Sequence, residues 1–418
     1  MANPRQLRNL IFSLSSGAAT AALAIAFLLI VAAPQPAQAQ TFNVIYTFTG
    51  GQDGAFPYAG VTMDKAGNLY GTASYGGAGY GTVYQLKHKG SGWIVNPLYS
   101  FTGGSDGSNP YARVIFGPNG ALYGTTTQGG YGYGTVFNLR PSVRACTTPS
   151  CPWTETVLYA FKGADGAFPK YGDLLFDQAG NIYGTTHDGG PSFFGTVYEL
   201  TPSGSGYTES VLYSFASSND GGNPFNGVIF DNAGDLYGTT GYGGLSIYGT
   251  VFELTRSGPG WTENVLYSFL GRSDGSYPFA GLIFDQSGNL YGATTDSGTG
   301  GGGTVFELTP SGGSWTFSLV YSLTGKLTYG CGPAGTLVMD GAGNLYGTTV
   351  CDGAHGRGSV FKLTPSDGNW MYTSLHDFTG GNDGANPSSN VVFDAKGNLY
   401  GTVNGGSQGV GVVWEITP

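Results

Sequence analysis

Short apolar stretches separated by glycine-rich turns recur along this chain at a regular spacing. The clearest unit reads roughly FDxxGNLYGTT, and its tyrosine recurs at Tyr70, Tyr123, Tyr183, Tyr237, Tyr291, Tyr346 and Tyr400. Successive tyrosines are 53 to 60 residues apart. A fixed period of this length, rich in strand formers and turns, is typical of the blades of a β-propeller.

One repeat illustrates the expected strands. We expect strand A at 228–230, strand B at 236–240, strand C at 250–254 and strand D at 261–269. Apolar residues run briefly or alternate within each stretch, and Gly and Asx turns separate the stretches. Each repeat should therefore form one sheet of four short antiparallel strands.

The strand count predicts how the ring closes. Strands A, B and C occur seven times, and no strand D follows the last strand C at 412–416. The segment 43–48, before the first strand A, has the pattern of a strand D. We therefore predict an all-β domain over residues 40–418, a seven-bladed β-propeller with four antiparallel strands per blade. Its N-terminal strand completes the last blade, which removes an exposed sheet edge.

The first 39 residues have the pattern of a signal peptide. Arg5 and Arg8 precede an apolar run at 18–33, and Ala37-Gln38-Ala39 supplies a cleavage site of small residues. The run is shorter than the roughly 20 residues of a membrane-spanning helix, although an uncleaved anchor is the alternative. We predict a signal peptide at 1–39 and a secreted, periplasmic or cell-surface monomer with no membrane span after its removal.

Composition and charge exclude one class of function. The formal net charge is −10, and only 10% of the residues are charged. Such a surface offers no basic groove for phosphates, so we expect no nucleic-acid partner. The 76 glycines and 21 prolines are interleaved with 28 tyrosines and 25 phenylalanines, which favours tight turns between packed strands over disorder.

An exported chain with four cysteines is expected to form disulfides. Cys146 and Cys151 bracket a short insertion and are predicted to close it. Cys331 and Cys351 fall in two loops of one blade that should lie on the same face, so we predict a second bridge between them. A CxxC pair or histidine cluster, which would indicate a metal site, does not accompany them.

Aspartates recur in the turns of the repeat. Six D–A loops, which connect one blade to the next, carry an Asp-Gly pair, at Asp53, Asp106, Asp165, Asp220, Asp274 and Asp383. We interpret each aspartate as a cap on the amides of its own turn. A ring of weak calcium sites is the alternative, although calcium needs six to eight oxygen ligands. Otherwise we expect no cofactor.

The units GTVFELTPSG, WTENVLYSF and DGxxPxAGLIFDxxGNLYGTT resemble the GloVer tandem repeat of exported bacterial proteins over residues 42–418. The resemblance implies a secreted or surface-displayed protein. It implies no catalytic residues, because that family is defined by its repeat. More distantly, the chain is similar to exported propellers that act as ligand-binding platforms.

In a propeller the D–A loops and the B–C loops meet on one face, around the mouth of the central channel, where functional residues usually lie. Arg113 and Asp173 stand at the entry of strand A in neighbouring blades and are predicted to pair there. The pair is either a structural plug or a ligand contact. As an exposed pair it would contribute only about 0–1 kcal/mol.

Aromatic residues gather in the same loops of the first four blades. The B–C loops carry Tyr75, Tyr80, Tyr131, Tyr133, Phe193, Phe194, Tyr242 and Tyr248, and the D–A loops add Phe56, Tyr58, Tyr111, Phe168, Tyr171 and Phe225. We predict that the B–C aromatics, with Arg113 and Asp173, bind a ligand, because exposed rings suit sugars or a protein partner. Packing of loop against loop is the alternative.

The candidate catalytic set is His187 with Asp173 and Arg113, which could serve as acid and base in a hydrolase or lyase acting on polysaccharide. His355, with Asp352 and Arg357 nearby, could also form an acid–base pair. His-Glu-x-x-His and phosphate-loop motifs do not occur. We therefore predict a non-catalytic binding or scaffold propeller that recognises a glycan, or an extracellular or envelope protein, on this face. The polysaccharide-cleaving enzyme is the alternative.

Overall fold

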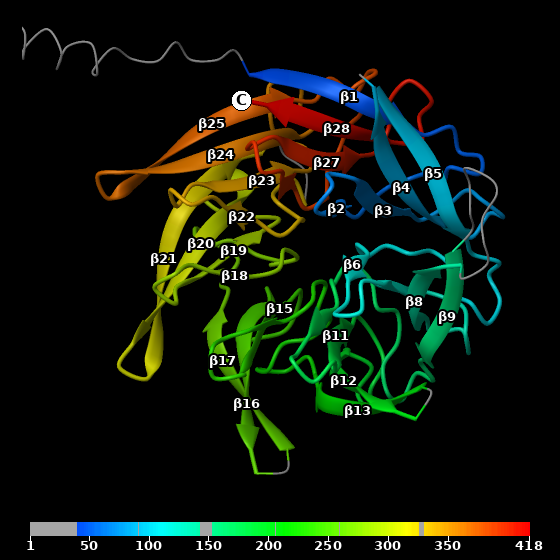
Figure 1. The fold of residues 1–418 in the computed structure, drawn as a ribbon. Helices are drawn as coiled ribbons and strands as arrows, with labels where there is room; N and C mark the ends of the chain where they lie inside the picture. Colours follow the sequence, from blue (N-terminus) through cyan, green and yellow to red (C-terminus); the bar gives the residue numbers. More distant parts are fainter. Residues whose placement is uncertain (1–39, 91, 143–152, 205, 259, 326–329) are drawn as a thin grey trace, which may run out of the picture. The chain divides into compact units, whose positions relative to one another are not determined.

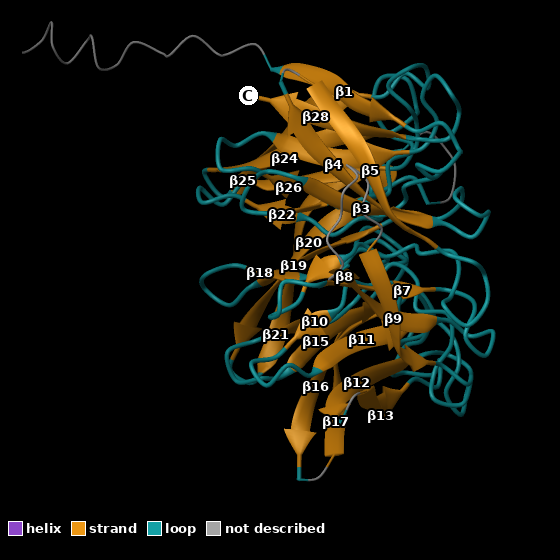
Figure 2. Ribbon diagram, turned by 45° about the vertical axis from the view of Figure 1, so that its right-hand side comes forward, coloured by secondary structure: helices purple, strands orange, loops and turns teal. Residues whose placement is uncertain are grey.

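The computed structural model describes residues 40–90, 92–142, 153–204, 206–258, 260–325 and 330–418. Within the unit of residues 42–417, the described strands form seven sheets of four strands each. Figure 1 shows these sheets following one another around a centre. In Figure 2 the described residues contain strands and loops but no helix. The predicted all-β, seven-bladed propeller is confirmed.

The inner strands are short. Strand A has two residues in every blade: β2 (Thr62–Met63), β6 (Ile115–Phe116), β10 (Leu175–Phe176), β14 (Ile229–Phe230), β18 (Ile283–Phe284), β22 (Val338–Met339) and β26 (Val392–Phe393). Strand B has five: β3 (Leu69–Ala73), β7 (Leu122–Thr126), β11 (Ile182–Thr186), β15 (Leu236–Thr240), β19 (Leu290–Thr294), β23 (Leu345–Thr349) and β27 (Leu399–Val403).

The outer strands are longer, and strands C and D are consecutive in the chain in every blade except the last. Strand C comprises β4 (Thr82–Lys89), β8 (Thr135–Pro141), β12 (Thr196–Ser203), β16 (Thr250–Ser257), β20 (Gly301–Ser311), β24 (Ser359–Ser366) and β28 (Val412–Thr417). Strand D comprises β5 (Gly92–Ser100), β9 (Trp153–Ala160), β13 (Gly206–Ser214), β17 (Gly260–Ser268), β21 (Ser314–Thr324), β25 (Asn369–Asp377) and β1 (Thr41–Thr47).

The glycine of the LYGTT motif lets an aromatic ring cross strand B. Gly238 of β15 is paired with Phe252 of β16, and a Cβ on Gly238 would collide with the Phe252 ring. The threonine that follows joins neighbouring blades, because the Thr239 hydroxyl donates to the carbonyl of Ala280 at 3.0 Å. The motif therefore serves packing within a blade and bonding to the next.

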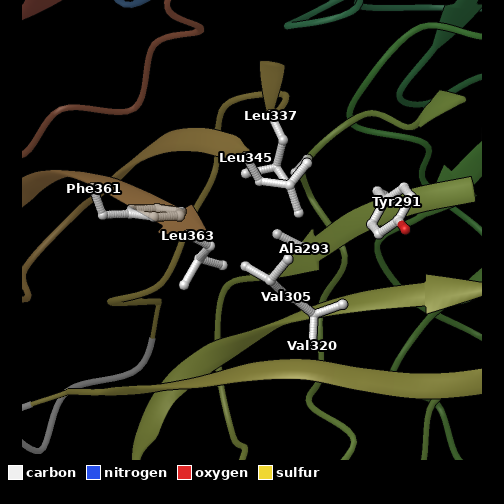
Figure 3. Packing of buried hydrophobic residues seen from close by; sticks show 9 residues of the cluster. Tyr291, Ala293, Val305, Val320, Leu337, Leu345, Phe361 and Leu363 are labelled. Atoms are coloured by element: carbon white, nitrogen blue, oxygen red, sulfur yellow. The ribbon is translucent and has the colours of Figure 1, made fainter. Parts of the chain in front are cut away.

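The hydrophobic core lies between neighbouring sheets. Figure 3 shows Ala293 and Val305 of one blade facing Leu337, Leu345 and Leu363 of the next. All five are fully buried. Six further clusters of buried residues have the same two-blade composition.

The aromatic residues near the start of strand D pack between blades. Trp315 of β21 lies 5.9 Å, centroid to centroid, from Tyr237 of β15 in the preceding blade. Trp93 of β5 makes the corresponding contact with Tyr400 of β27 at 6.1 Å. The second contact joins the first blade to the last.

The N-terminal strand closes the ring. β1 forms the outer strand of the sheet β1-β28-β27-β26. The Phe48 N–H donates to the carbonyl of Gly411 at 3.0 Å, which continues the pairing beyond β1. The predicted closure is confirmed.

Two predictions lie outside the described residues. The signal peptide at 1–39 and the Cys146–Cys151 bridge stay predictions for this reason. In the described part of the chain, no helix combines the length and the apolar character needed to cross a membrane.

The predicted bridge between Cys331 and Cys351 is present, with a Cα–Cα distance of 4.6 Å. In the preceding blade the corresponding residues, Ser276 and Asp296, form a β-bridge between the D–A and B–C loops. The sixth blade thus joins the same two loops covalently, and its D–A loop is the one that has no Asp-Gly pair.

Replacing both cysteines by serine (Cys331→Ser, Cys351→Ser) should lower the free energy of unfolding by about 2–3 kcal/mol, because the bridge closes a loop of 20 residues. Denaturant unfolding of the purified protein measures this. Addition of a reductant should destabilise the wild type more than the serine variant, which keeps only the Cys146 and Cys151 pair. Equal stability of both proteins in oxidising buffer would contradict the prediction.

Candidate functional site

Each D–A loop is held by its aspartate. Asp106 accepts the N–H of Thr102 at 2.8 Å and the hydroxyl of Tyr99 at 3.1 Å. Asp53, Asp165, Asp220, Asp274 and Asp383 accept equivalent bonds within their own loops. The predicted role as a turn cap is therefore confirmed.

The described residues contain no group of three or more His, Cys, Asp or Glu side chains placed to hold a metal ion. The capping bonds already occupy carboxylate oxygens of the loop aspartates. Whether calcium binds, and whether the protein works without a cofactor, remain predictions.

A backbone feature beyond the capped turn points the next side chains toward the channel mouth. The residue before the loop proline has a positive φ, for example 57° at Phe56, 54° at Asn109 and 53° at Phe168. Positive φ is unusual for side chains of this kind and redirects the chain. The aromatic residue one position after the proline, or two positions after it at Tyr171, then lines the central cavity.

These residues form an aromatic crescent, comprising Tyr58, Tyr111, Tyr171, Phe225 and Phe279 of five consecutive blades. Successive ring centroids are 5.2, 5.6, 6.2 and 3.8 Å apart. Burial first, and then the neighbouring tyrosines, raise the pKa of Tyr111, so its hydroxyl remains a hydrogen-bond donor.

The crescent lines a cavity of about 360 Å³ at the channel mouth. The remaining wall comes from the sixth and seventh blades and is small and polar, formed by residues such as Ala334, Asn386, Ser388 and Asn404. One side of the cavity is therefore aromatic and the other carries amides and hydroxyls. Ligand pockets commonly combine an apolar lining with a few such polar groups.

Arg113 and Asp173 form the floor. Arg113 donates from Nη2 at 2.5 Å and from Nε at 3.1 Å, both to Oδ2 of Asp173. The Asn390 amide donates to the same oxygen at 3.4 Å, and its own Oδ1 accepts the N–H of Thr336 at 2.8 Å. Side chains from three blades and the backbone of a fourth are thus linked across the mouth.

The pair also separates two cavities. Arg113, Asp173, Asn226 and Asn390 line both the mouth cavity and a second cavity of about 310 Å³ along the inner strands. The predicted pairing is confirmed, but the expected exposure is wrong. The side chains of Arg113 and Asp173 are only 23% and 22% exposed, because neighbouring loops enclose them. Removal of one partner alone should therefore cost more than it does in a surface pair.

The B–C aromatics do not line the mouth cavity in the described structure. Tyr75 and Tyr242 stand behind the crescent, with Tyr242 6.3 Å from Phe225 and 6.0 Å from Phe279. Tyr75 meets the Phe56 ring edge to face at 5.8 Å and is among the groups that raise the pKa of Tyr111. These two side chains support the crescent.

Other B–C aromatics cover the next D–A loop. A Cβ on Gly103, Gly163 or Gly271 would meet the ring of Tyr80, Tyr133 or Tyr248, respectively. The carbonyl of Phe194 accepts the N–H of Asn223 at 2.7 Å. Packing of loop against loop therefore accounts for these four residues.

Two of the B–C aromatics lie at exposed loop tips. Tyr131 is 69% exposed and Phe193 is 74% exposed. Leu245 and Ile247, at 73% and 68%, continue this apolar edge on the fourth blade and were not among the predicted residues. These side chains are available to a partner but lie apart from the cavity lining.

The candidate catalytic set is only partly assembled. His187 Nδ1 lies 2.9 Å from Oδ2 of its neighbour Asp188, and its ring meets the Phe225 ring edge to face at 4.6 Å. Burial acts to raise the pKa of Asp188, but His187, Lys170 and Asn223 outweigh it and hold that pKa below its usual value. In the described structure, His187 is not among the residues that line the cavity with Asp173.

The crescent is the feature that the sequence prediction missed as a unit. Four members were noted only as additional aromatics, and Phe279 was not noted. The signal is the step from the loop proline to an aromatic residue, as in Pro57-Tyr58, Pro224-Phe225 and Pro278-Phe279.

Comparison with known proteins identifies the repeat. The Gloeobacter/Verrucomicrobia repeat matches at residues 34–151, 148–329 and 259–418. The chain belongs to this repeat family. The resemblance found in the sequence is therefore confirmed. The family model describes the repeat, so the cavity of this chain must be interpreted from its own residues. No curated protein matches the chain.

Several solved structures are similar to this family member in fold. A putative glucose dehydrogenase from Thermus thermophilus is 16% identical, with a TM-score of 0.44 and coverage of 74% of this chain and 96% of that one. A gluconolactonase from Xanthomonas campestris is 13% identical, with a TM-score of 0.41 and coverage of 91% and 89%. A putative 6-phosphogluconolactonase from Bacteroides uniformis is 11% identical, with a TM-score of 0.47 and coverage of 76% and 83%. At these identities the likeness does not extend to a substrate or a reaction.

Proposed function

We propose that this protein is an exported, non-catalytic recognition propeller that binds the end of a glycan in the mouth cavity. The observation that carries the proposal is the aromatic crescent facing a polar wall. A pyranose has apolar C–H faces and a rim of hydroxyls, so it can place one face on the rings and its hydroxyls on the amides and serines.

The size and chemistry of the cavity support a small polar ligand. Its volume of about 360 Å³ is at the lower end of the range of ligand pockets, roughly 300–1,000 Å³. A purely apolar ligand would leave the enclosed Oδ1 of Asn404 without a hydrogen-bond partner, which is unfavourable, whereas a sugar hydroxyl can donate to it. The Cys331–Cys351 bridge supports export, because disulfides persist in oxidising compartments.

The proposal is tested by a glycan and polysaccharide screen of the purified protein, read for both binding and cleavage. Phe225→Ala and Tyr171→Ala should each weaken binding of the glycan found by about five- to tenfold, because each removes a stacking ring worth about 1–1.4 kcal/mol. The control is Tyr131→Ala, a change of the same size on an exposed tip, which should leave the affinity unchanged.

Three outcomes would overturn the proposal. If no glycan binds, the proposal that the ligand is a glycan is wrong. Binding lost in Tyr131→Ala but kept in Phe225→Ala would move the site to the loop tips. Cleavage of a polysaccharide that is lost in His187→Ala would establish the enzyme instead.

A further inference from the structure

The same position of strand D is glutamate in three consecutive blades. Glu155 on β9, Glu209 on β13 and Glu263 on β17 each stand two residues after the aromatic that opens the strand. Each has its Oε1 enclosed, without a hydrogen-bond partner in the described structure. The strand-pairing partners are Leu139, Leu200 and Leu254, so the neighbouring strand supplies no polar group.

The other four blades carry an apolar or aromatic residue at this position: Val95, Phe317, Tyr372 and Phe42. Phe317 stacks on Tyr267 of the preceding blade, with centroids 4.4 Å apart and planes 15° apart. Tyr372 stacks on Tyr321 at 5.3 Å. We call the interface between the strands D of two neighbouring blades a seam. The three glutamates therefore occupy the position in the seam where Phe317 and Tyr372 each place a stacked ring.

The groups that face each glutamate come from the preceding strand D and from the D–A loop. Glu155 faces Tyr99 and Asp106, and the other two clusters repeat this arrangement. Glu209 faces Tyr159, Asp165 and Lys162, and Glu263 faces Tyr213 and Asp220. In each cluster the tyrosine hydroxyl donates to the aspartate, at 3.1, 2.5 and 3.2 Å respectively.

Two carboxyl groups thus share each seam. Burial first, and then the aspartate, raise the pKa of Glu155, Glu209 and Glu263 to about 7. Each aspartate caps the loop that carries part of the cavity. The Asp106 loop leads to Tyr111 and Arg113, the Asp165 loop to Tyr171 and Asp173, and the Asp220 loop to Phe225.

We propose that Glu155, Glu209 and Glu263 form a proton-operated clamp that holds these three loops more firmly in mildly acidic than in alkaline solution. A protonated glutamate is neutral beside the capping aspartate, whereas an ionised one repels it and weakens the cap. The clamp regulates the cavity of the proposed function, but it can be tested without any sugar.

The direction in which stability changes with pH follows from proton linkage. A glutamate with a raised pKa in the folded state holds a proton that the unfolded chain has released, so its contribution to stability is complete below about pH 4.5 and is lost as the pH rises through about 7. His376 acts in the opposite direction, because burial lowers its pKa. The wild type and a glutamate variant share His376, so the difference between them isolates the clamp.

The first test compares thermal unfolding of the wild type and of Glu155→Gln/Glu209→Gln/Glu263→Gln. Between about pH 5 and about pH 8, we expect the wild type to lose about 5 °C more in Tm than the variant. Glu307→Gln removes one glutamate elsewhere and should keep the wild-type profile. If the triple glutamine variant does not fold, Glu155→Phe/Glu209→Phe/Glu263→Phe copies the Phe317 seam and is used instead.

The second test locates the effect by hydrogen exchange, with both proteins compared at the same pH. At about pH 8, loops 101–113, 161–173 and 215–226 should exchange faster in the wild type than in the variant, and at about pH 5 equally. Loop 269–279, whose seam holds Phe317, is the internal control. Parallel pH profiles of Tm, or an equal difference in the control loop, would overturn the clamp. Failure of the glycan screen would leave this result intact.

Discussion

Phe48→Ala should lower the free energy of unfolding by about 3–5 kcal/mol, the range for loss of a fully buried phenylalanine. Phe48 directly follows β1, is fully buried, and meets the Tyr84 ring edge to face at 5.0 Å. Its cluster includes Val413 and Tyr400 of the last blade and Val61 of the first. The substitution therefore leaves a cavity at the junction where the ring closes. Denaturant unfolding followed by tryptophan fluorescence measures the loss.

A matched change on the same strand separates closure from strand stability. Val44 of β1 is 36% exposed, so Val44→Ala should cost less than about 1 kcal/mol. Similar small losses for both variants would mean that the N-terminal strand is not needed to close the propeller. The predicted difference of about threefold or more between the two losses depends on the placement of Phe48 between the first and last blades.

The fold could be predicted because the same pattern of strands and turns recurs in seven repeats. The glycine of LYGTT is explained by the ring that crosses it, and the missing last strand D is explained by the residues before the first strand A. Boundaries were less accurate. Strands C and D extend into their hairpin turn, as in the pairing of Ser311 with Ser314, because nothing in the residue pattern marks where pairing stops.

The site was predicted only in part, for a conformational reason. Arg113 and Asp173 could be paired because they replace glycine at one position of the repeat. The residue pattern could not show which loop aromatics belong to the crescent. Neighbouring residues such as Phe56 and Tyr58 are both aromatic, but only the Tyr58 side chain lines the cavity. The direction of these two side chains is set by a φ of 57° at Phe56, which side chains of this type rarely adopt.

Arg113→Ala should destabilise the protein by about 3–4 kcal/mol, because it leaves a largely enclosed carboxylate without its cation. The Asn390 amide, at 3.4 Å, would be the closest remaining donor to Asp173 Oδ2. Asp173→Leu should cost less, since an arginine can extend its guanidinium toward water. Thermal and denaturant unfolding of the two single variants measure this asymmetry. If both variants lose less than about 1 kcal/mol of stability, the pair behaves as a solvent-exposed ion pair and the prediction is wrong.

The double variant Arg113→Met/Asp173→Leu decides what the pair is for. Replacing both charges by apolar groups of similar size should restore stability to within about 1–2 kcal/mol of the wild type. With the fold restored, glycan affinity becomes a clean measure of contact, and we expect at least a tenfold loss because the pair forms the cavity floor. Unchanged affinity in a stable double variant would show that the pair only plugs the channel, and that the crescent and the polar wall bind the ligand without it.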